Sequence, residues 1–163
     1  MRLSCRAVLF DLDGVLVDSH LVVERTWQRW LARHDLHIPG LVARAHGRRS
    51  VETVLDVAPH LDAETEVRWL AEAELLDTDG LVALPGAQAA IAALPEARRA
   101  VVTSGGRALA SLRLHQVGLP LPAVLVAAED VRAGKPSPEC YRLAASRLGV
   151  DPAQCVVVED TPA

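Results

Sequence analysis

The chain has 163 residues, of which half are apolar and 23% are charged, and its formal net charge is −4. This is the composition of a globular protein with one sizeable core, or with a core and a small insert. We expect no nucleic-acid partner, because the net charge is negative and the basic residues form no stripe.

The first predicted element is an apolar strand from Ala7 to Leu12, of the kind that is buried on both faces of a parallel sheet. Asp11 and Asp13 lie at its end. We expect Gly14 to let the chain turn here and bring both side chains to the rim. Two carboxylates placed there can serve as a nucleophile or metal ligand and as a general acid/base, unless they are simply solvated loop acids.

A helical insert follows, with no convincing strand between residues 16 and 82. The predicted helices run from Leu21 to His34, from Ser50 to Val57 and from Leu61 to Leu76. All three tryptophans fall in this region, so we expect it to have a small core of its own. The sequence therefore predicts a helical cap at 16–82, whose return hinges contain Gly80 and Gly86. Residues 1–15 and 83–163 then form a discontinuous core.

Three further apolar runs predict the rest of the sheet. They cover Ala100 to Thr103, Ala123 to Val126 and Cys155 to Val158, and helical patterns lie between them at Ala108 to Val117 and Pro138 to Leu148. Strands that alternate with helices are typical of parallel crossover connections. The predicted fold class is α/β, a Rossmann-like parallel sheet core with an inserted α-helical cap domain. Ligands of such sheets bind at the carboxyl ends of the strands.

Polar groups follow the second predicted strand and precede the last helix. Thr103, Ser104 and Gly105 end a strand just before a helix, where hydroxyls and backbone N–H groups can hold an anion, although such residues are also common in ordinary helix caps. Lys135 is the only lysine of the chain, and the prolines around it are expected to hold its segment extended. A lysine fixed in this way can pair with both a carboxylate and a phosphate oxygen, unless it is a solvated loop residue.

Two adjacent acids, Glu159 and Asp160, end the last predicted strand. Carboxylates at a strand end suit Mg²⁺, which binds few protein carboxylates and keeps several waters. The alternative is an ordinary acidic turn.

The cysteines and the hydropathy indicate a compartment. Cys5, Cys140 and Cys155 lack the paired spacing of a disulfide framework or a zinc site, which fits a reducing environment. No leader precedes residue 7, and no apolar run approaches about 18 residues. We expect a cytoplasmic protein without a membrane partner, as a monomer or a weak homo-oligomer.

Four stretches resemble the motifs of the haloacid dehalogenase-like hydrolases. They are DLDGVLVDS at 11–19, VTSG at 102–105, GKP at 134–136 and VEDTPA at 158–163. The helical insert matches the position of the small cap of that superfamily. AHGRRS at 45–50 and LPGA at 84–87 resemble its branch of sugar-phosphate and glycerol-phosphate phosphatases.

The resemblance implies a magnesium-dependent phosphatase that acts on a small phosphorylated metabolite. Asp11 would attack phosphorus and carry an aspartyl-phosphate, while Asp13 would protonate the leaving alcohol and then activate water. Thr103 and the Ser104 amide would hold the transferring group, and Lys135 would neutralise its charge.

The same resemblance implies a metal site and a cap site. The Asp11 carboxylate, the Asp13 carbonyl and Asp160 would bind Mg²⁺, with Glu159 assisting. His46, Arg48 and Arg49 in the cap would contact sugar or phosphate, or else form a solvated basic turn.

Two alternatives remain at this point. A sugar-phosphate mutase keeps every motif of this chain. The family also continues beyond its fourth motif with a glycine, a helix and at least one more strand, so we expect this sequence to be a fragment, which could be inactive.

Overall fold

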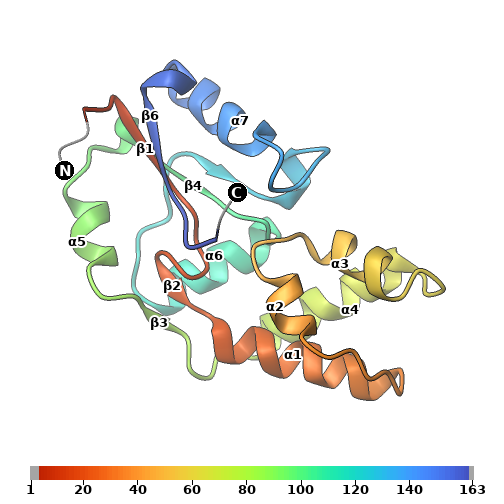
Figure 1. Ribbon diagram of the computed structural model, residues 1–163. Helices are drawn as coiled ribbons and strands as arrows, with labels where there is room; N and C mark the ends of the chain where they lie inside the picture. The colour runs from red at the N-terminus through yellow and green to blue at the C-terminus, as the bar shows by residue number, and fades with distance from the viewer. Residues whose placement is uncertain (1–3, 162–163) are drawn as a thin grey trace.

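A four-stranded parallel sheet forms the core of the computed structural model, which describes residues 4–161. The strand order is β5 (Leu125–Val126), β4 (Arg99–Val102), β1 (Ala7–Phe10) and β6 (Cys155–Val158), and every neighbouring pair is parallel. The four predicted apolar runs therefore all supply strands, although β1 ends at Phe10 and β5 spans only two residues. Figure 1 shows β1 and β6, the first and last of these strands in the sequence, side by side in the sheet.

Helices cover both faces of this sheet, as expected for an α/β fold. Leu9 and Val102 point to the face packed by α7 (Glu139–Leu148), where Cys140 and Ala144 are buried against them. Phe10 and Val101, one residue out of phase, point to the opposite face, covered by α5 (Ala87–Ala92) and α6 (Arg107–Gln116). The runs in β1 and β4 lack alternation because both faces are buried, whereas Val157 and Val158 of the edge strand β6 are exposed. The short helix α5 was not predicted.

The cap consists of four helices, α1 (His20–Arg33), α2 (Leu41–Ala45), α3 (Ser50–Val57) and α4 (Ala63–Leu76). Three of them match the predicted helices, whereas the five-residue α2 was missed. Trp27 and Trp30 are buried at its centre with their ring centroids 5.4 Å apart in an edge-to-face arrangement, and Trp69 packs at the rim of the same cluster. The prediction that the tryptophans give the cap its own core is confirmed.

A two-stranded antiparallel ribbon joins the cap to the core. It pairs β2 (Val17–Asp18) with β3 (Val82–Ala83), in register Val17 to Ala83 and Asp18 to Val82. The expectation that 16–82 contains no strand is therefore wrong. Two-residue strands that pair across the 63 intervening positions from 19 to 81 leave no local pattern to read. Gly80 and Gly86, the two glycines expected at the return from the cap, have φ of 86° and 89°, which glycine adopts readily.

Short 3₁₀ turns complete the described chain, η1 (Glu96–Arg98), η2 (Ala128–Asp130) and η3 (Pro152–Gln154). Each lies in a connection at one end of a strand. Within residues 4–161, none of the helices has both the length and the apolar character needed to cross a membrane.

Candidate active site

Three of the strands bring their polar ends together at the carboxyl edge of the sheet. Asp11 directly follows β1, and its backbone N–H donates to the Val158 carbonyl of β6 at 2.9 Å. The Lys135 ammonium lies 2.8 Å from Asp11 Oδ1 and 2.7 Å from Glu159 Oε1. Asp11 is 4% exposed and Lys135 7% exposed, so the contact is buried. The lone lysine is thus a partner of two strand-end carboxylates, and the alternative of a solvated loop lysine is excluded.

The segment around Lys135 is a turn rather than the extended run that its prolines predicted. The Ser137 N–H donates to the Gly134 carbonyl at 2.9 Å, and the Lys135–Pro136 peptide is cis. The turn directs the Lys135 side chain inward, where it also lies 3.5 Å from the Val102 carbonyl at the end of β4.

The surroundings shift the pKa values of Asp11 and Glu159 in opposite directions. Burial raises the pKa of Asp11 to about 7, against the opposing attraction of Lys135. Burial also acts on Glu159, but the hydrogen bond and charge of Lys135 outweigh it and lower the pKa of Glu159 to about 2. Burial alone would lower the pKa of Lys135, whereas the Asp11 and Glu159 carboxylates raise it. Glu159 is therefore the constant anionic partner of Lys135, and a cation near Asp11 would favour the charged form of that carboxyl.

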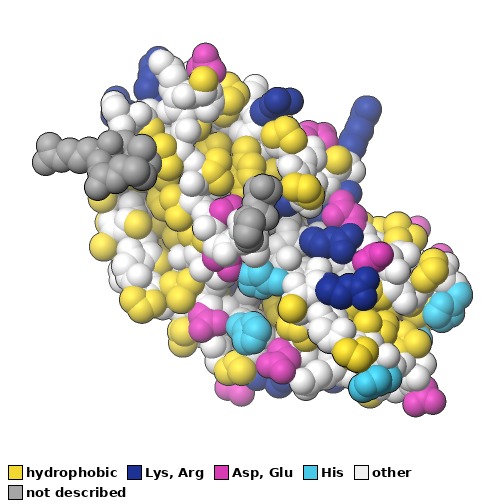
Figure 2. All heavy atoms as spheres, in the orientation of Figure 1, with side chains coloured by type: hydrophobic (Ala, Val, Ile, Leu, Met, Phe, Trp, Pro, Cys, Tyr) yellow, Lys and Arg dark blue, Asp and Glu magenta, His cyan; other side chains and the backbone are white. Residues whose placement is uncertain are grey.

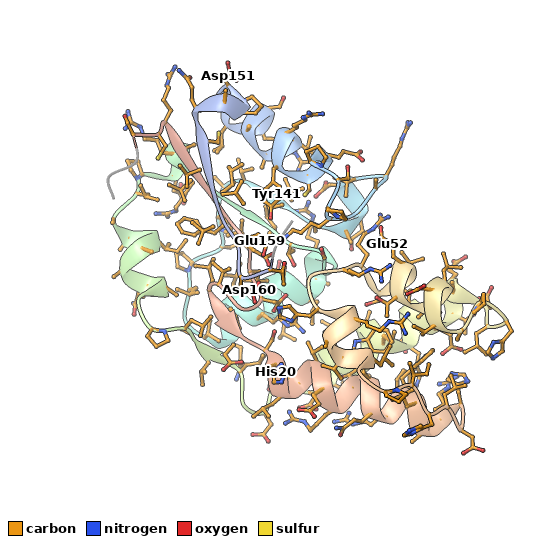
Figure 3. The ribbon with its side chains drawn as sticks, viewed as in Figure 1. His20, Glu52, Tyr141, Asp151, Glu159 and Asp160 are labelled. Atoms are coloured by element: carbon orange, nitrogen blue, oxygen red, sulfur yellow. The ribbon has the colours of Figure 1, made fainter. Side chains whose placement is uncertain are left out.

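Tyr141, which sequence reasoning missed, completes this group from α7. Its hydroxyl donates to Glu159 Oε1 at 2.9 Å, and Lys135 Nζ lies 5.3 Å from its ring centroid. Burial raises the pKa of Tyr141, so the phenol keeps its proton and remains a donor. In Figure 3 the Tyr141 and Glu159 side chains approach each other between α7 and the end of β6. The available signal was the position of Tyr141, the only tyrosine, six residues after the only lysine.

Asp13 is held beside Asp11 by a sharp turn. The Gly14 N–H donates to the Val17 carbonyl at 2.9 Å, and Gly14 has φ of 81°. A Cβ on Gly14 would lie only 2.0 Å from Asp160 Oδ2, so glycine is required by space as well as by conformation. The predicted turn is confirmed, and it brings Asp13 and Asp160 to the same rim.

Two further residues orient the Asp13 carboxylate. Ser19 Oγ donates to Asp13 Oδ1 at 2.7 Å, and Arg113 Nη1 lies 2.8 Å from the same oxygen. Both contacts use Oδ1, so together they fix the orientation of the carboxylate. Arg113 was missed in the sequence because it lies in the middle of α6, far from any motif.

The predicted anion cradle lies at the end of β4. Thr103 is buried, and its Oγ1 accepts the Gly105 N–H at 3.0 Å. Ser104 Oγ donates instead to the Gly47 carbonyl of the cap at 2.8 Å. These contacts form a tight turn that also ties the core to the cap.

A group of carboxylates near this turn could hold a metal ion. One oxygen each from Asp11, Glu159 and Asp160 lies within 4.8 Å of the others. An all-oxygen donor set of this kind fits Mg²⁺ in chemistry. The Asp13 carboxylate is outside this group. Figure 3 shows Glu159 and Asp160 at the end of β6, facing the junction with the cap.

The three basic cap residues all face the cavity but differ in their partners. His46 Nε2 lies 2.8 Å from Asp160 Oδ2, and Arg48 Nη1 lies 3.4 Å from Asp56. Arg49 pairs with Glu52 at 2.6 Å and donates to the Val131 and Arg132 carbonyls of the core at 3.3 and 3.0 Å. Arg49 therefore fastens the cap to the core loop that precedes Lys135.

A cavity of about 410 Å³ lies between cap and core. The residues from both parts that line it include Asp11, Asp13, His46, Arg48, Arg49, Thr103, Ser104, Gly105 and Arg113. On the face shown in Figure 2, histidine and acidic side chains gather along the junction of the two parts. The volume is that of a small-molecule site. The structure thus brings the sequence-predicted polar residues after β1 and β4 and those of the cap loop to one cavity, while Lys135 and Glu159 lie behind Asp11 and do not line it.

Several known proteins are similar to this chain in sequence and in fold. Hexitol phosphatase A of Escherichia coli K12 is 42% identical over 166 residues, which cover 99% of this chain and 77% of that protein. Glycerol-1-phosphate phosphohydrolase 2 of Saccharomyces cerevisiae is 31% identical over 175 residues, which cover 100% of this chain and 70% of that protein. A hydrolase structure from Pseudomonas syringae superposes with a TM-score of 0.83 at 26% identity, over 94% of this chain and 74% of that one.

A β-phosphoglucomutase structure from Clostridium difficile superposes with a TM-score of 0.84 at 17% identity, over 96% of this chain and 77% of that one, and thus shares the fold. The family described as haloacid dehalogenase-like hydrolase matches residues 5–163. With its parallel sheet, helical cap and strand-end acids, the chain belongs to the haloacid dehalogenase-like hydrolases.

Proposed function

We propose that this protein is a Mg²⁺-dependent phosphatase that hydrolyses a small phosphorylated metabolite, a sugar phosphate or glycerol phosphate, through an aspartyl-phosphate. The observation that carries the proposal is the buried contact of Asp11 with Lys135, 2.8 Å long, beside Asp13 at the wall of the cavity between cap and core. A carboxylate nucleophile, a fixed positive charge and a second carboxyl group are the parts that phosphoryl transfer through an enzyme aspartate requires. Relatives named for hexitol and glycerol phosphates support the substrate class.

The reaction would proceed in two displacements at phosphorus. An oxygen of Asp11 attacks phosphorus, the bond to the leaving oxygen breaks, and Asp13 gives its proton to that oxygen, so that the alcohol departs. Water then attacks the phosphorus of the aspartyl-phosphate and passes a proton to Asp13. The bond between Asp11 and phosphorus breaks, which releases inorganic phosphate and restores both carboxyl groups.

The surrounding residues would position the transferring group. Thr103, Ser104 and Gly105 would contact its oxygens, and Lys135 would balance the charge that moves between Asp11 and the phosphoryl group. The Asp11 carboxylate, the Asp13 carbonyl and Asp160, with Glu159 assisting, would hold Mg²⁺. When bound, the ion supplies further positive charge to the phosphoryl oxygens.

The cap would enclose the substrate, with His46 and Arg48 near its polar groups. Closure over the cavity limits the entry of water during the first displacement. Arg49, fastened to Glu52 and to the core, would act on closure more than on the substrate. The three cysteines are free thiols, which supports a reducing compartment such as the cytoplasm.

The test is phosphate release from a panel of sugar phosphates and glycerol phosphate, with Mg²⁺ and with EDTA. We expect release that requires Mg²⁺ and falls to background in Asp11→Asn, which removes the nucleophile but keeps its shape. Asp13→Asn should lower kcat by about 10²–10⁴-fold, the usual contribution of general acid–base catalysis.

The control is Asp35→Asn, which makes the same chemical change at an exposed residue with φ of 51°, a conformation that asparagine tolerates. Full activity of Asp11→Asn would overturn the mechanism. Conversion of a sugar phosphate to its isomer, without phosphate release, would favour a mutase. A folded chain that releases no phosphate from any substrate would contradict the proposed function.

A further inference from the structure

A buried ion pair crosses from the cap to the core within the cavity. Arg113 of α6 is 3% exposed and Glu74 of α4 is 8% exposed, and both line the cavity. One Arg113 nitrogen, Nη2, pairs with Glu74, while the other, Nη1, lies 2.8 Å from Asp13. Arg113 therefore connects the cap with Asp13, the residue that we propose as the proton donor to the leaving oxygen.

The Glu74–Arg113 pair retains hydrogen-bonding groups that do not contact other described residues. The Nε–H of Arg113 is buried and has no acceptor among the residues that the structure describes. Among residues 4–161, Glu74 bonds through Oε2, which leaves Oε1 as an acceptor. Burial raises the pKa of Glu74, against the opposing effect of Arg113. Because Glu74 and Arg113 both line the cavity, a ligand hydroxyl, which both accepts and donates, can bond to this pair.

The charges around the cavity disfavour an anionic leaving group. The charged residues that line it are five acids, Asp11, Asp13, Asp18, Glu74 and Glu129, and three arginines, Arg48, Arg49 and Arg113. Each of these arginines already has a carboxylate partner. Arg48 pairs with Asp56, Arg49 with Glu52 and Arg113 with Glu74. A second phosphate or a carboxylate on the substrate would have to compete with these carboxylates for an arginine. It would also approach the carboxylates of Glu74 and Asp13, which have the same sign of charge.

The remaining walls suit a carbon skeleton. Val23, Trp27, Val67 and Ala71 line the cavity from α1 and α4, on the side of the cap that carries Glu74. Apolar walls with a few fixed polar groups are typical of sites that bind small neutral molecules.

We propose that Glu74 and Arg113 are specificity-determining residues that bind hydroxyls of an uncharged leaving group and reject substrates whose leaving group carries a second negative charge. The favoured class is the monophosphates of polyols and neutral sugars. Phosphoglycolate and sugar bisphosphates are disfavoured. This inference rests on the proposed phosphatase function and narrows its substrates.

The test compares kcat/KM, at saturating Mg²⁺, for mannitol phosphate and glycerol phosphate with kcat/KM for phosphoglycolate and fructose bisphosphate. In the wild-type protein the ratio of anionic to neutral substrates should lie well below one. Glu74→Gln keeps the shape and frees the charge of Arg113, and it should raise the ratio about tenfold or more, since a like-charge contact is removed. Glu74→Asp, which keeps the charge, should keep the ratio low even if kcat falls.

The matched control is Glu72→Gln, the same change two residues away on the exposed side of α4, which should leave the ratio unchanged. A loss of stability alone lowers the activity on all substrates and does not move the ratio. The inference is overturned if the wild-type protein prefers phosphoglycolate or the bisphosphate, or if a folded Glu74→Gln keeps the wild-type ratio. Should Glu74→Gln fail to fold, the wild-type ratio still decides. Absence of phosphate release from every substrate, p-nitrophenyl phosphate included, would instead contradict the proposed function.

Discussion

The Lys135 ammonium lies between two buried carboxylates, 2.8 Å from Asp11 and 2.7 Å from Glu159. An ammonium is a compact charge with three donors that can point in different directions, whereas a guanidinium is a wide planar fork. Space between two carboxylates, a carbonyl and the Tyr141 ring favours the compact group. This gives a physical reason for one lysine in a chain whose other basic residues are arginine.

Replacement of this lysine should affect both activity and stability. We expect Lys135→Met to lower kcat by about 10²-fold or more, because a charged donor at the transferring group is lost. It should also reduce the free energy of unfolding by about 3–5 kcal/mol, because Asp11 and Glu159 lose a buried partner. Phosphate release and urea unfolding measure the two effects.

The matched variant is Lys135→Arg, which keeps the charge and changes the geometry. It should recover part of the stability but little of the activity. Wild-type kcat in folded Lys135→Met would show that the ammonium takes no part in the reaction.

Residue type and position in a motif were enough to predict Asp11, Asp13, Lys135 and the two strand-end acids. Tyr141, Arg113 and Glu74 were not predictable in this way, because each lies within a helix and gains its role from a contact with a distant segment. Helical periodicity assigns such residues to a face of their own helix and says nothing of what that face meets.

At the scale of elements, α3 and the loop before Lys135 are joined by a close approach at Gly134. The Gly134 N–H donates to Glu52 Oε1 at 3.1 Å, and Glu52 in turn holds Arg49. A Cβ on Gly134 would lie 2.7 Å from both Arg49 Nε and Glu52 Oε1. Figure 3 shows Glu52 on the side of the cap that faces the core.

We therefore expect Gly134→Ala to displace the Arg49–Glu52 pair and weaken cap closure. KM should rise for substrates that the cap encloses, while the backbone tolerates alanine because the φ of Gly134 is not positive. Steady-state kinetics with wild type and Gly134→Ala measure the change. Ala133→Ser, an exposed neighbour, should behave as wild type, and an unchanged KM in Gly134→Ala would show that this contact does not hold the cap.

A second link between elements joins α1 to the segment that follows α4. Asp77 accepts from Arg25 Nη2 at 2.8 Å and from Arg29 Nη2 at 2.5 Å. The hydrogen bond from Arg25, followed by that from Arg29, lowers the pKa of Asp77 from 3.8 to about 2. Since the folded-state pKa is depressed, the stabilisation is fully present above the ordinary value and is lost as pH falls through the folded value.

The expected result is a pH-dependent difference between wild type and Asp77→Asn. The difference in free energy of unfolding should be constant from neutral pH down to about 4 and should shrink as pH approaches 2. Urea unfolding at several pH values measures it. Glu64→Gln, at a side chain that is 86% exposed, is the control without such a dependence. A difference that grows at low pH would contradict the assigned pKa.

For the whole molecule, the cavity lies between the cap, which has its own hydrophobic cluster, and the α/β core, whose sheet has a hydrophobic cluster on each face. Trp27 belongs to the core of the cap and also lines the cavity, whereas Trp30 and Trp69 do not line it. All of the tryptophan fluorescence therefore comes from the cap, and one ring lies where a ligand would bind.

Ligand binding should change the fluorescence through Trp27. We expect inorganic phosphate with Mg²⁺ to alter the emission of the wild-type protein and of Trp69→Phe, because Trp27 remains in both. In Trp27→Phe the change should be largely lost, which a fluorescence titration measures. Persistence of the full change in Trp27→Phe would show that phosphate acts on the cap from elsewhere.

The sequence by itself determined the order of the four sheet strands and of the longer helices, the α/β fold, the helical insert and the residues that end the strands. These features leave local signals, since buried parallel strands are apolar runs, helices have a period, and parallel strands bring their carboxyl ends to one edge. The tertiary structure alone decided the β2–β3 ribbon, the turn at Lys135, and the contacts of Arg49, Arg113 and Glu74 between cap and core. These depend on how two folded parts meet, which no local pattern encodes, because the pairing partners are distant in the chain and are selected by packing.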